Sequence, residues 1–312
     1  MTTAFIFPGQ GSQAVGMGRA LSEASPAARA IFGEVDEALK QNLSRLMFEG
    51  PEDELTLTAN AQPAIMASSL AALRVLEEGG IRLSEKARYV AGHSLGEYSA
   101  LSAADALSVD ETARLLRIRG DAMQAAVAPG EGAMAAILGL DHDAVIRIAE
   151  EASGDDGIVA AANDNAPGQV VISGHAAAVD RAIALAKAAG ARRAMALSVS
   201  APFHCALMQP AADAMEKALA SARLSAPVVP LIANVTAAAV TDPATIRQLL
   251  VEQVTGAVRW RESVLHLAEL GVDRFVEFGG KVLGPMVKRI VPDATIYSLV
   301  SMDDAEQIAK NL

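Results

Sequence analysis

Gly92-His93-Ser94-Leu95-Gly96 lies between a short apolar stretch, residues 88–91, and a stretch compatible with a helix, residues 97–104. A strand that turns at once into a helix holds its middle residue in a strained conformation, and a Cβ two positions to either side would clash across the turn. Ser94 would then stand at the carboxyl edge of a sheet, with its Oγ exposed above a helix N-terminus, as a nucleophile requires. The pentapeptide alone also fits a glycine-rich turn with a capping serine, so its surroundings must decide.

Length, charge and cysteine usage bound the setting. The 312 residues are enough for one large domain or two unequal ones. The chain has no long apolar run and no basic-then-apolar opening segment, which predicts a soluble, cytoplasmic protein with no membrane span. The single cysteine, Cys205, excludes an internal disulfide and suits a reducing compartment. The formal net charge of −11 argues against nucleic acid as a partner, and would repel an acidic partner unless Lys and Arg are gathered locally.

Strand-like and helix-like stretches alternate through most of the chain, which is typical of an α/β fold with a mainly parallel sheet. Helical periodicity marks residues 61–78 and 110–127, and strand-like runs occupy residues 228–232 and 274–278.

One segment departs from this alternation and reads as β-α-β-β-α-β, the ferredoxin-like order. Its predicted elements are strand 132–140, helix 141–152, strands 157–163 and 169–173 around a turn at 165–168, helix 175–189 and strand 193–199. The sequence therefore predicts an inserted subdomain over residues 129–199 within a core formed by residues 1–128 and 200–312.

A nucleophilic serine requires a base, an orienting group and donors for an oxyanion. His204 is the favoured base because it lies where a predicted strand ends and a helix begins, and active residues of open α/β sheets collect there. His93 adjoins the serine, but neighbouring side chains at a tight turn point apart. Structural or surface positions are expected for His142, His175 and His266. Cys205 is expected to be a buried, inert thiol.

Arg119 lies on the apolar face of the helix predicted over residues 110–127, because Leu115, Leu116 and Met123 are three or four positions away. A buried arginine is rarely tolerated without an acceptor. Two alternatives stay open: an internal ion pair with an acidic residue of a neighbouring helix, or a bidentate clamp on a substrate carboxylate.

The loop at residues 7–14 contains G-x-G-x-x-A after a strand, which is a dinucleotide fingerprint. That interpretation needs an acidic residue at the end of a second strand about twenty positions on, whereas Glu34 and Asp36 lie in a stretch that looks helical. A glycine-rich loop at a sheet edge can instead aim backbone N–H groups at an oxyanion, and Gln10 is the closest candidate.

Several collinear motifs, spanning about residues 3 to 301, resemble the malonyl-CoA:acyl-carrier-protein transacylase family. They are Phe7-Pro8-Gly9-Gln10-Gly11-Ser12-Gln13, the stretch 92–100, Arg119-Gly120 with Met123-Gln124, the stretch 165–174, Pro202-Phe203-His204, and Gln253 with Val258-Arg259-Trp260. The resemblance implies an α/β-hydrolase-like core with an inserted ferredoxin-like subdomain, which agrees with the order of elements above. Two departures, at Gly256-Ala257 and at a shortened loop over residues 279–281, affect loop shape rather than the expected chemistry.

The resemblance also implies roles for individual residues. Ser94 would be the acylated nucleophile and His204 its base, with Gln253 orienting His204 through its side chain or its backbone carbonyl. The backbone N–H groups of Gln10 and Leu95 would form the oxyanion hole. The substrate would contact Arg119 as the carboxylate clamp, and Gln62 and Phe203 as walls of the acyl pocket.

The function implied is transfer of malonyl from malonyl-CoA to the phosphopantetheine thiol of acyl carrier protein by a ping-pong route, supplying fatty-acid synthesis. No metal or redox cofactor is expected, and the protein is expected to be a monomer with no nucleic-acid or membrane partner. Alternatives are a discrete acyltransferase of a polyketide pathway, a serine hydrolase or thioesterase, and a silent carrier-protein-binding module. Basic residues expected to dock the acidic carrier protein are Lys187, Arg192, Arg193, Lys281, Lys288 and Arg289.

Overall fold

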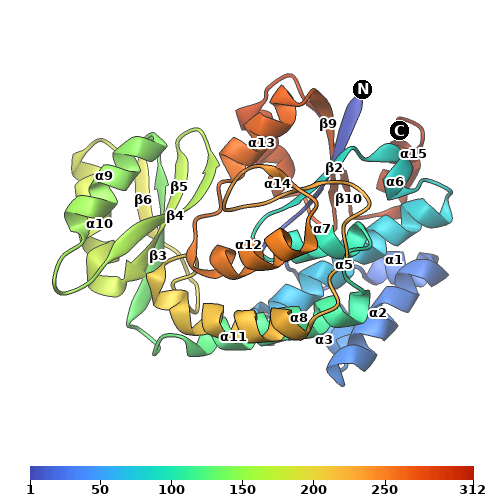
Figure 1. Ribbon diagram of the computed structural model, residues 1–312, viewed down its shortest axis with the longest axis horizontal. Coiled ribbons are helices and arrows are strands. Elements are labelled where there is room, and N and C mark those ends of the chain that lie inside the picture. Colours follow the sequence, from blue (N-terminus) through green and yellow to red (C-terminus); the bar gives the residue numbers. More distant parts are fainter.

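The computed structural model describes all residues from 1 to 312, and its larger unit is built on a six-stranded sheet with the order β10-β9-β1-β2-β7-β8 (Figure 1). All neighbours in this sheet are parallel except β7 and β8. The strands are β1 Thr2–Phe7, β2 Tyr89–Gly92, β7 Leu231–Ile232, β8 Ala239–Val240, β9 Val272–Phe278 and β10 Thr295–Leu299.

Helices cover both faces of this sheet, as the alternation of β1 requires. Phe5 and Phe7 point into the larger apolar core of 58 buried residues, whereas Ala4 and Ile6 point into a second core of 15 buried residues that includes side chains of α13 and α14. The helices of this unit are α1 Arg19–Ala24, α2 Pro26–Leu39, α3 Leu43–Glu49, α4 Glu52–Thr56, α5 Thr58–Glu78, α6 Leu83–Lys86, α7 Gly96–Ala103, α8 Val109–Ala125, α11 Gln209–Ser221, α12 Pro243–Thr255, α13 Trp260–Glu269, α14 Leu283–Ile290 and α15 Met302–Ala309. None of the helices is both long enough and apolar enough to cross a membrane.

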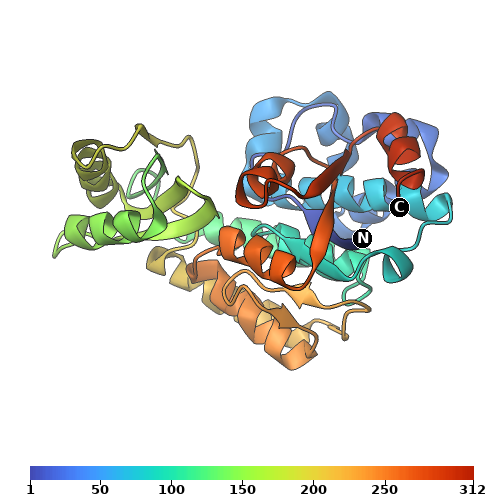
Figure 2. The same ribbon diagram turned by 90° about the horizontal axis from the view of Figure 1, so that it is seen from above.

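The smaller unit is a four-stranded antiparallel sheet with the order β4-β5-β3-β6, and it projects to one side of the core (Figure 2). Its elements are β3 Gly132–Leu138, α9 His142–Ala152, β4 Val159–Ala166, β5 Gln169–His175, α10 Ala176–Ala188 and β6 Arg193–Ala196. Both helices share a separate apolar core of 14 buried residues with the sheet. The predicted fold class is therefore confirmed: a hydrolase-like α/β core with a ferredoxin-like subdomain. The exact boundaries at 128/129 and 199/200 stay predictions.

Backbone hydrogen bonds join the two units. The N–H of Asp164 on β4 donates to the carbonyl of Val258 at 3.0 Å, and the N–H of Val258 donates to the carbonyl of Ala162 at 2.8 Å. The end of β4 is thus held against the segment that leads into α13.

Three predicted strands were too long, and the first of them, predicted over 132–140, ends at Leu138. The run at 228–232 shrinks to β7, because Pro227 and Pro230 cannot donate to a ladder. The strand predicted over 193–199 ends at Ala196, so His204 lies in a loop after β6, ahead of a short 3₁₀ turn at Ala206–Met208, rather than at the end of a strand. The turn expected at 165–168 is tighter than predicted, since β4 continues through Ala166 and Gly168 takes the left-handed φ of 67° that such a turn needs.

Candidate active site

The Gly92–Gly96 pentapeptide forms the sharp strand–helix turn that the sequence predicts, between β2 and α7. Ser94 has a left-handed φ of 53°, which is strained for a residue with a side chain. A Cβ on Gly92 would lie 1.9 Å from the backbone of Gly96, and a Cβ on Gly96 would lie 2.2 Å from the carbonyl oxygen of Phe7. No side chain caps the N-terminus of α7, so the capping alternative for Ser94 is wrong.

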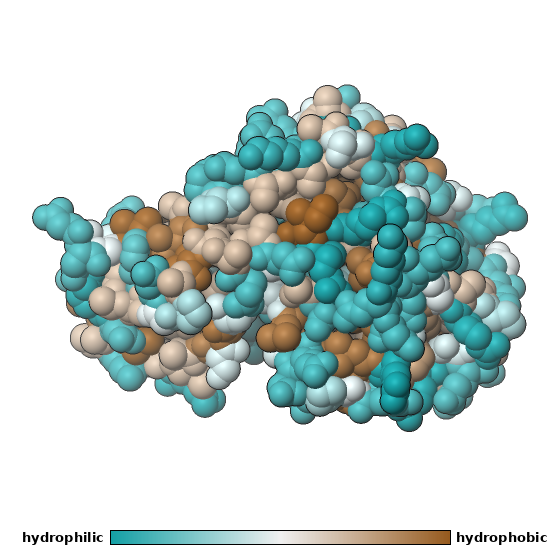
Figure 3. Space-filling view, turned by 90° about the horizontal axis from the view of Figure 1, so that it is seen from below, coloured by the Kyte–Doolittle hydropathy of each residue, from teal (hydrophilic) through white to brown (hydrophobic).

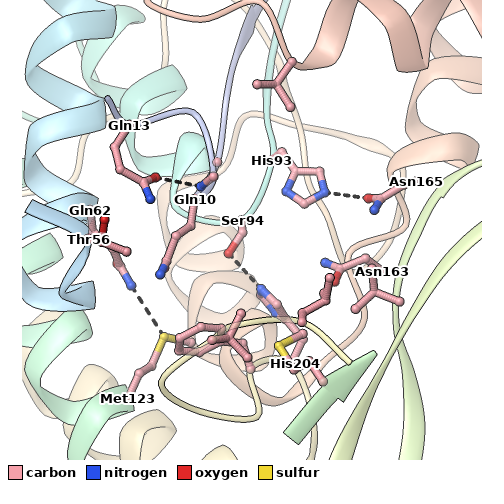
Figure 4. A pocket seen from close by; sticks show the side chains of 18 of the residues that line it. Gln10, Gln13, Thr56, Gln62, His93, Ser94, Met123, Asn163, Asn165 and His204 are labelled. Carbon is pink, nitrogen blue, oxygen red and sulfur yellow. Dashed lines mark hydrogen bonds between the residues drawn. The ribbon is translucent and has the colours of Figure 1, made fainter. Parts of the chain in front are cut away.

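The Ser94 hydroxyl instead contacts His204, with 2.7 Å between Oγ and Nε2 (Figure 4). The other ring nitrogen, Nδ1, lies 2.9 Å from the backbone carbonyl of Gln253 and 3.1 Å from that of Gly256. Because carbonyl oxygens only accept, Nδ1 carries the hydrogen and Nε2 is left to accept the Ser94 proton. Burial, reinforced by the positive charge of Arg119, lowers the pKa of His204 to about 3.

Arg119 is buried on α8, as the spacing predicts, and it lies against the same hydroxyl. Its Nη2 donates to Ser94 Oγ at 3.1 Å and to Gln253 Oε1 at 2.9 Å, while Nη1 donates to Gln62 Oε1 at 2.9 Å. All three acceptors are neutral, so Arg119 forms no ion pair and that alternative is wrong. The Nε of Arg119 has no hydrogen-bond partner. The guanidinium therefore lines the same pocket as Ser94 and keeps Nε as an unpaired donor that a carboxylate could occupy.

The predicted oxyanion donors come from two loops that touch. Gly9 packs so closely on the turn that a Cβ would lie 2.6 Å from the carbonyl oxygen of His93. This close approach brings the loop after β1 beside Ser94, and Gln10 lines the same pocket. The backbone N–H groups of Gln10 and Leu95 donate to no group within the chain, which leaves both available to an oxyanion.

Ser94, His204 and Arg119 line a cavity of about 360 Å³ between the core and the ferredoxin-like unit. The core contributes Gln62, Met123 and Phe203, and the smaller unit contributes Asn163 and Asn165, as Figure 4 shows for the labelled residues. In the space-filling view a notch separates the smaller unit from the core (Figure 3). The volume suits a small acyl group with part of a carrier arm rather than a large substrate.

Two residues at the site were not predicted. Asn234 follows β7, and its Oδ1 accepts from the N–H of Ser94 at 2.8 Å while its Nδ2 donates to the carbonyl of Gly92 at 2.6 Å. Glu97 in the first turn of α7 is 1% exposed, and burial raises its pKa to about 7. The position of Asn234 at the carboxyl end of a strand was an available signal, whereas Glu97 reads in the sequence as an ordinary acidic residue at a helix N-terminus.

His93 Nε2 donates to Asn165 Oδ1 at 2.8 Å and does not contact the Ser94 hydroxyl. Cys205 is buried, and burial raises the pKa of its thiol. Glu34 and Asp36 lie within α2, as the argument against a dinucleotide site expects. No group of three or more His, Cys, Asp and Glu side chains is arranged to hold a metal ion.

The chain resembles known acyltransferases in sequence and in structure. Residues 4–281 match the family model described as Acyl transferase domain. The malonyl CoA-acyl carrier protein transacylase of Bacillus subtilis (strain 168) is 48% identical over 288 residues, which cover 92% of this chain and 90% of the relative. The crystal structure of acyl-carrier-protein-S-malonyltransferase from Bartonella henselae aligns with a TM-score of 0.98 at 53% identity, covering 100% of this chain and 99% of that chain. A type II polyketide synthase acyl-carrier protein in complex with its malonyl-transacylase aligns with a TM-score of 0.96 at 40% identity, covering 100% of both chains.

Proposed function

The chain belongs to the acyl transferase family, and from this membership we propose that it transfers malonyl from malonyl-CoA to the phosphopantetheine thiol of acyl carrier protein, supplying fatty-acid synthesis. One observation carries the proposal. Ser94 Oγ lies 2.7 Å from His204 Nε2 and 3.1 Å from Arg119 Nη2. A base for the hydroxyl and a cation for a carboxylate thus meet at one nucleophile.

In the first half-reaction His204 Nε2 takes the Ser94 proton as Oγ bonds to the thioester carbonyl carbon. The negative charge that develops on the carbonyl oxygen is received by the N–H groups of Gln10 and Leu95. When the intermediate collapses, the carbon–sulfur bond breaks and the departing CoA sulfur takes the proton from His204. The product is a malonyl ester on Ser94.

The second half-reaction runs in the opposite sense. His204 takes the proton of the phosphopantetheine thiol, whose sulfur bonds to the ester carbon, and the carbon–oxygen bond to Ser94 breaks. The proton returns to Ser94 Oγ. The backbone carbonyls of Gln253 and Gly256 hold the ring through Nδ1 in both directions, so the Gln253 carbonyl does the orienting work of a triad carboxylate.

The acyl pocket would select malonyl by charge and by size. The Arg119 guanidinium would bind the malonyl carboxylate through Nε and Nη2. Gln62, which accepts from Nη1, would hold the guanidinium in place from the other side. Phe203 lines the cavity beside His204, and its ring would exclude a substituent at the malonyl α-carbon.

The same proposal covers the setting of the reaction. The donor is malonyl-CoA, the acceptor is acyl carrier protein, no metal or redox cofactor takes part, and the enzyme works as a cytoplasmic monomer. A role in a polyketide pathway is the second candidate, because a polyketide carrier protein has been captured with a malonyl-transacylase of the same fold. A serine hydrolase is disfavoured because water as acceptor gives no role to the buried Arg119.

The proposal is tested by locating the acyl group. The protein is mixed with malonyl-CoA, quenched and weighed intact, and the added mass is then mapped by digestion. We expect one malonyl group on Ser94, none in Ser94→Ala, and an unchanged adduct in Ser200→Ala, whose serine lies in the neighbouring loop. A label on another residue, or none on the wild type, would overturn the mechanism.

A further inference from the structure

Glu97 is a fully buried carboxylate beneath the nucleophile that the proposed reaction does not use. It lies three residues after Ser94, in the first turn of α7, and is 1% exposed. Its Oε2 accepts from Gln253 Nε2 at 2.8 Å and from the backbone N–H of Asn234 at 3.2 Å. A charged group at this depth persists only where its surroundings compensate for it.

The two residues that donate to Glu97 also contact the site, one at Arg119 and the other at Ser94. The side chain of Gln253 turns its Oε1 to Arg119 Nη2 at 2.9 Å. Asn234 turns its Oδ1 to the N–H of Ser94 at 2.8 Å. Glu97 is therefore separated from the Arg119 guanidinium by a single amide group.

This separation matters because Arg119 has no ion-pair partner. Burial lowers the pKa of the guanidinium, and Glu97 is the only carboxylate whose charge opposes that shift. A carboxylate in direct contact would occupy the donors that face Ser94. Placed one amide away, the negative charge opposes the cost of burying the cation, the contact with Nη2 is made by the neutral Gln253 amide, and Nε keeps no partner within the chain.

We propose that Glu97 is a positioning residue that serves as the counter-charge of Arg119 and limits how tightly a malonyl group is held on Ser94. The inference rests on the proposed function. With Glu97 ionised, a malonyl carboxylate brings a second negative charge to one cation, so the acyl-enzyme is only moderately stabilised. A transferase needs this moderation, because the acyl group must leave again for a second thiol of similar energy.

Glu97→Gln tests the charge, since the amide oxygen can still accept from Gln253 and Asn234. The fraction of enzyme acylated is measured by intact mass at pH 8 and a fixed ratio of malonyl-CoA to CoA, and then with acetyl-CoA. We expect the equilibrium constant for acylation by malonyl-CoA to rise roughly ten-fold or more, with the constant for acylation by acetyl-CoA unchanged.

Transfer from the malonyl-enzyme to free pantetheine should slow by a similar factor, so KM for malonyl-CoA and kcat fall together. The matched control is Glu277→Gln, which neutralises the other fully buried glutamate, on β9; its ratio of malonyl to acetyl acylation should stay that of the wild type.

An unchanged ratio in folded Glu97→Gln overturns the inference. If that variant does not fold, the coupling is read in the wild type as proton uptake at pH 7.5, by calorimetry in buffers of different ionisation enthalpy. Malonylation should raise the Glu97 pKa further and take up a fraction of a proton beyond acetylation. Of the other titratable groups that face Glu97, Tyr98 has a raised pKa, His204 has a pKa of about 3, His93 has a lowered pKa, and Arg119 stays charged, so none of these changes charge near pH 7.5. Equal uptake for both acyl groups overturns the inference, and a wild type that forms no malonyl adduct overturns the proposed function together with it.

Discussion

His204, the proposed base, lies in surroundings that oppose a positive charge on its ring. Burial lowers its pKa first, and the neighbouring Arg119 adds to the shift, so that the value falls from 6.5 to about 3. The two carbonyls at Nδ1 act in the other direction and would stabilise the imidazolium that the proposed transfer requires. The resting enzyme therefore keeps its base neutral well below the pH at which an exposed histidine would be protonated.

We predict that acylation by acetyl-CoA keeps its rate between pH 8 and pH 5. The base works only when neutral, and a lowered pKa extends the neutral form to lower pH, so the rate is lost only as the pH falls toward the shifted value. Acetyl-CoA is chosen because it carries no carboxylate to interact with Glu97. Rapid-quench measurement of the Ser94 adduct checks this, and a fall in rate centred near pH 6.5 would contradict it.

Arg119 should select for acyl groups that carry a carboxylate. A charge-assisted bidentate pair contributes about 1.5–3 kcal/mol, so Arg119→Ala should weaken malonyl acylation roughly ten- to a hundred-fold while acetyl acylation changes much less. The comparison variant is Arg117→Ala. Arg117 is also on α8, but its side chain donates to Gln41 rather than to Ser94. Equal losses with both acyl groups in folded Arg119→Ala would assign Arg119 a structural role.

Single-residue prediction from the sequence succeeded where a side chain's position follows from periodicity. The buried face of Arg119 could be predicted from three- and four-residue spacing, but its acceptors could not. Those acceptors, on Gln62 and Gln253, come from helices far apart in the chain. Glu97 was missed for the same reason, since its burial depends on α12 and on the loop after β7 closing over α7.

Among the elements, the turn between β2 and α7 is the one that the sequence determines most strictly. A Cβ at Gly96 would lie 2.2 Å from the carbonyl oxygen of Phe7 and 2.8 Å from that of Pro8. Both atoms belong to the backbone where β1 ends and the loop that carries Gln10 begins, and neither can rotate away. The glycine thus fixes the distance between the nucleophile and the loop that carries Gln10.

Gly96→Ala should therefore lower the free energy of unfolding by at least about 2–3 kcal/mol, because the loop or the helix must shift. Gly33→Ala is the matched control: this glycine lies inside α2, and a Cβ there would meet no atom within 4 Å. That substitution should stabilise the protein by about 0.5–1 kcal/mol. Urea unfolding of both variants checks the pair, and similar stability for the two would show that the turn tolerates a side chain.

Elements whose pattern is carried by their own residues were predicted well, and those that depend on partners were not. The ferredoxin-like order could be predicted because each strand and helix of residues 132–196 has its own periodicity. The strand at 228–232 failed because Pro230 interrupts an apolar run that looks continuous and Pro227 stands directly before it. The loop that carries His204 has no periodic signal at all, and its left-handed φ of 58° at that residue arises from tertiary packing.

At the scale of the whole molecule, the cavity lies between the core and the ferredoxin-like unit, and contacts at the rim of the cavity join the two units. β4 bonds to the segment before α13, and Arg289 on α14 donates to Gln169 Oε1 on β5 at 3.0 Å. The helix α14 therefore borders the cavity with Leu283 and Met286 and meets the smaller unit through Arg289.

Docking of an acidic carrier protein should use basic side chains at this rim, although the protein as a whole carries a net charge of −11. Lys281, Lys288 and Arg289 are exposed around α14. Exposed charges act mainly on the rate of encounter and are screened over about 8 Å at physiological salt. Transfer from the malonyl-enzyme to carrier protein should therefore slow as ionic strength rises, whereas transfer to free pantetheine, which carries no comparable charge, should change little.

Lys281→Glu should reduce the salt dependence and slow only the carrier reaction. Lys310→Glu, a matched charge reversal beyond the last turn of α15, should leave the carrier reaction unchanged. Stopped-flow measurement of both acceptors checks this, and an equal response of the two to salt would place the docking surface elsewhere.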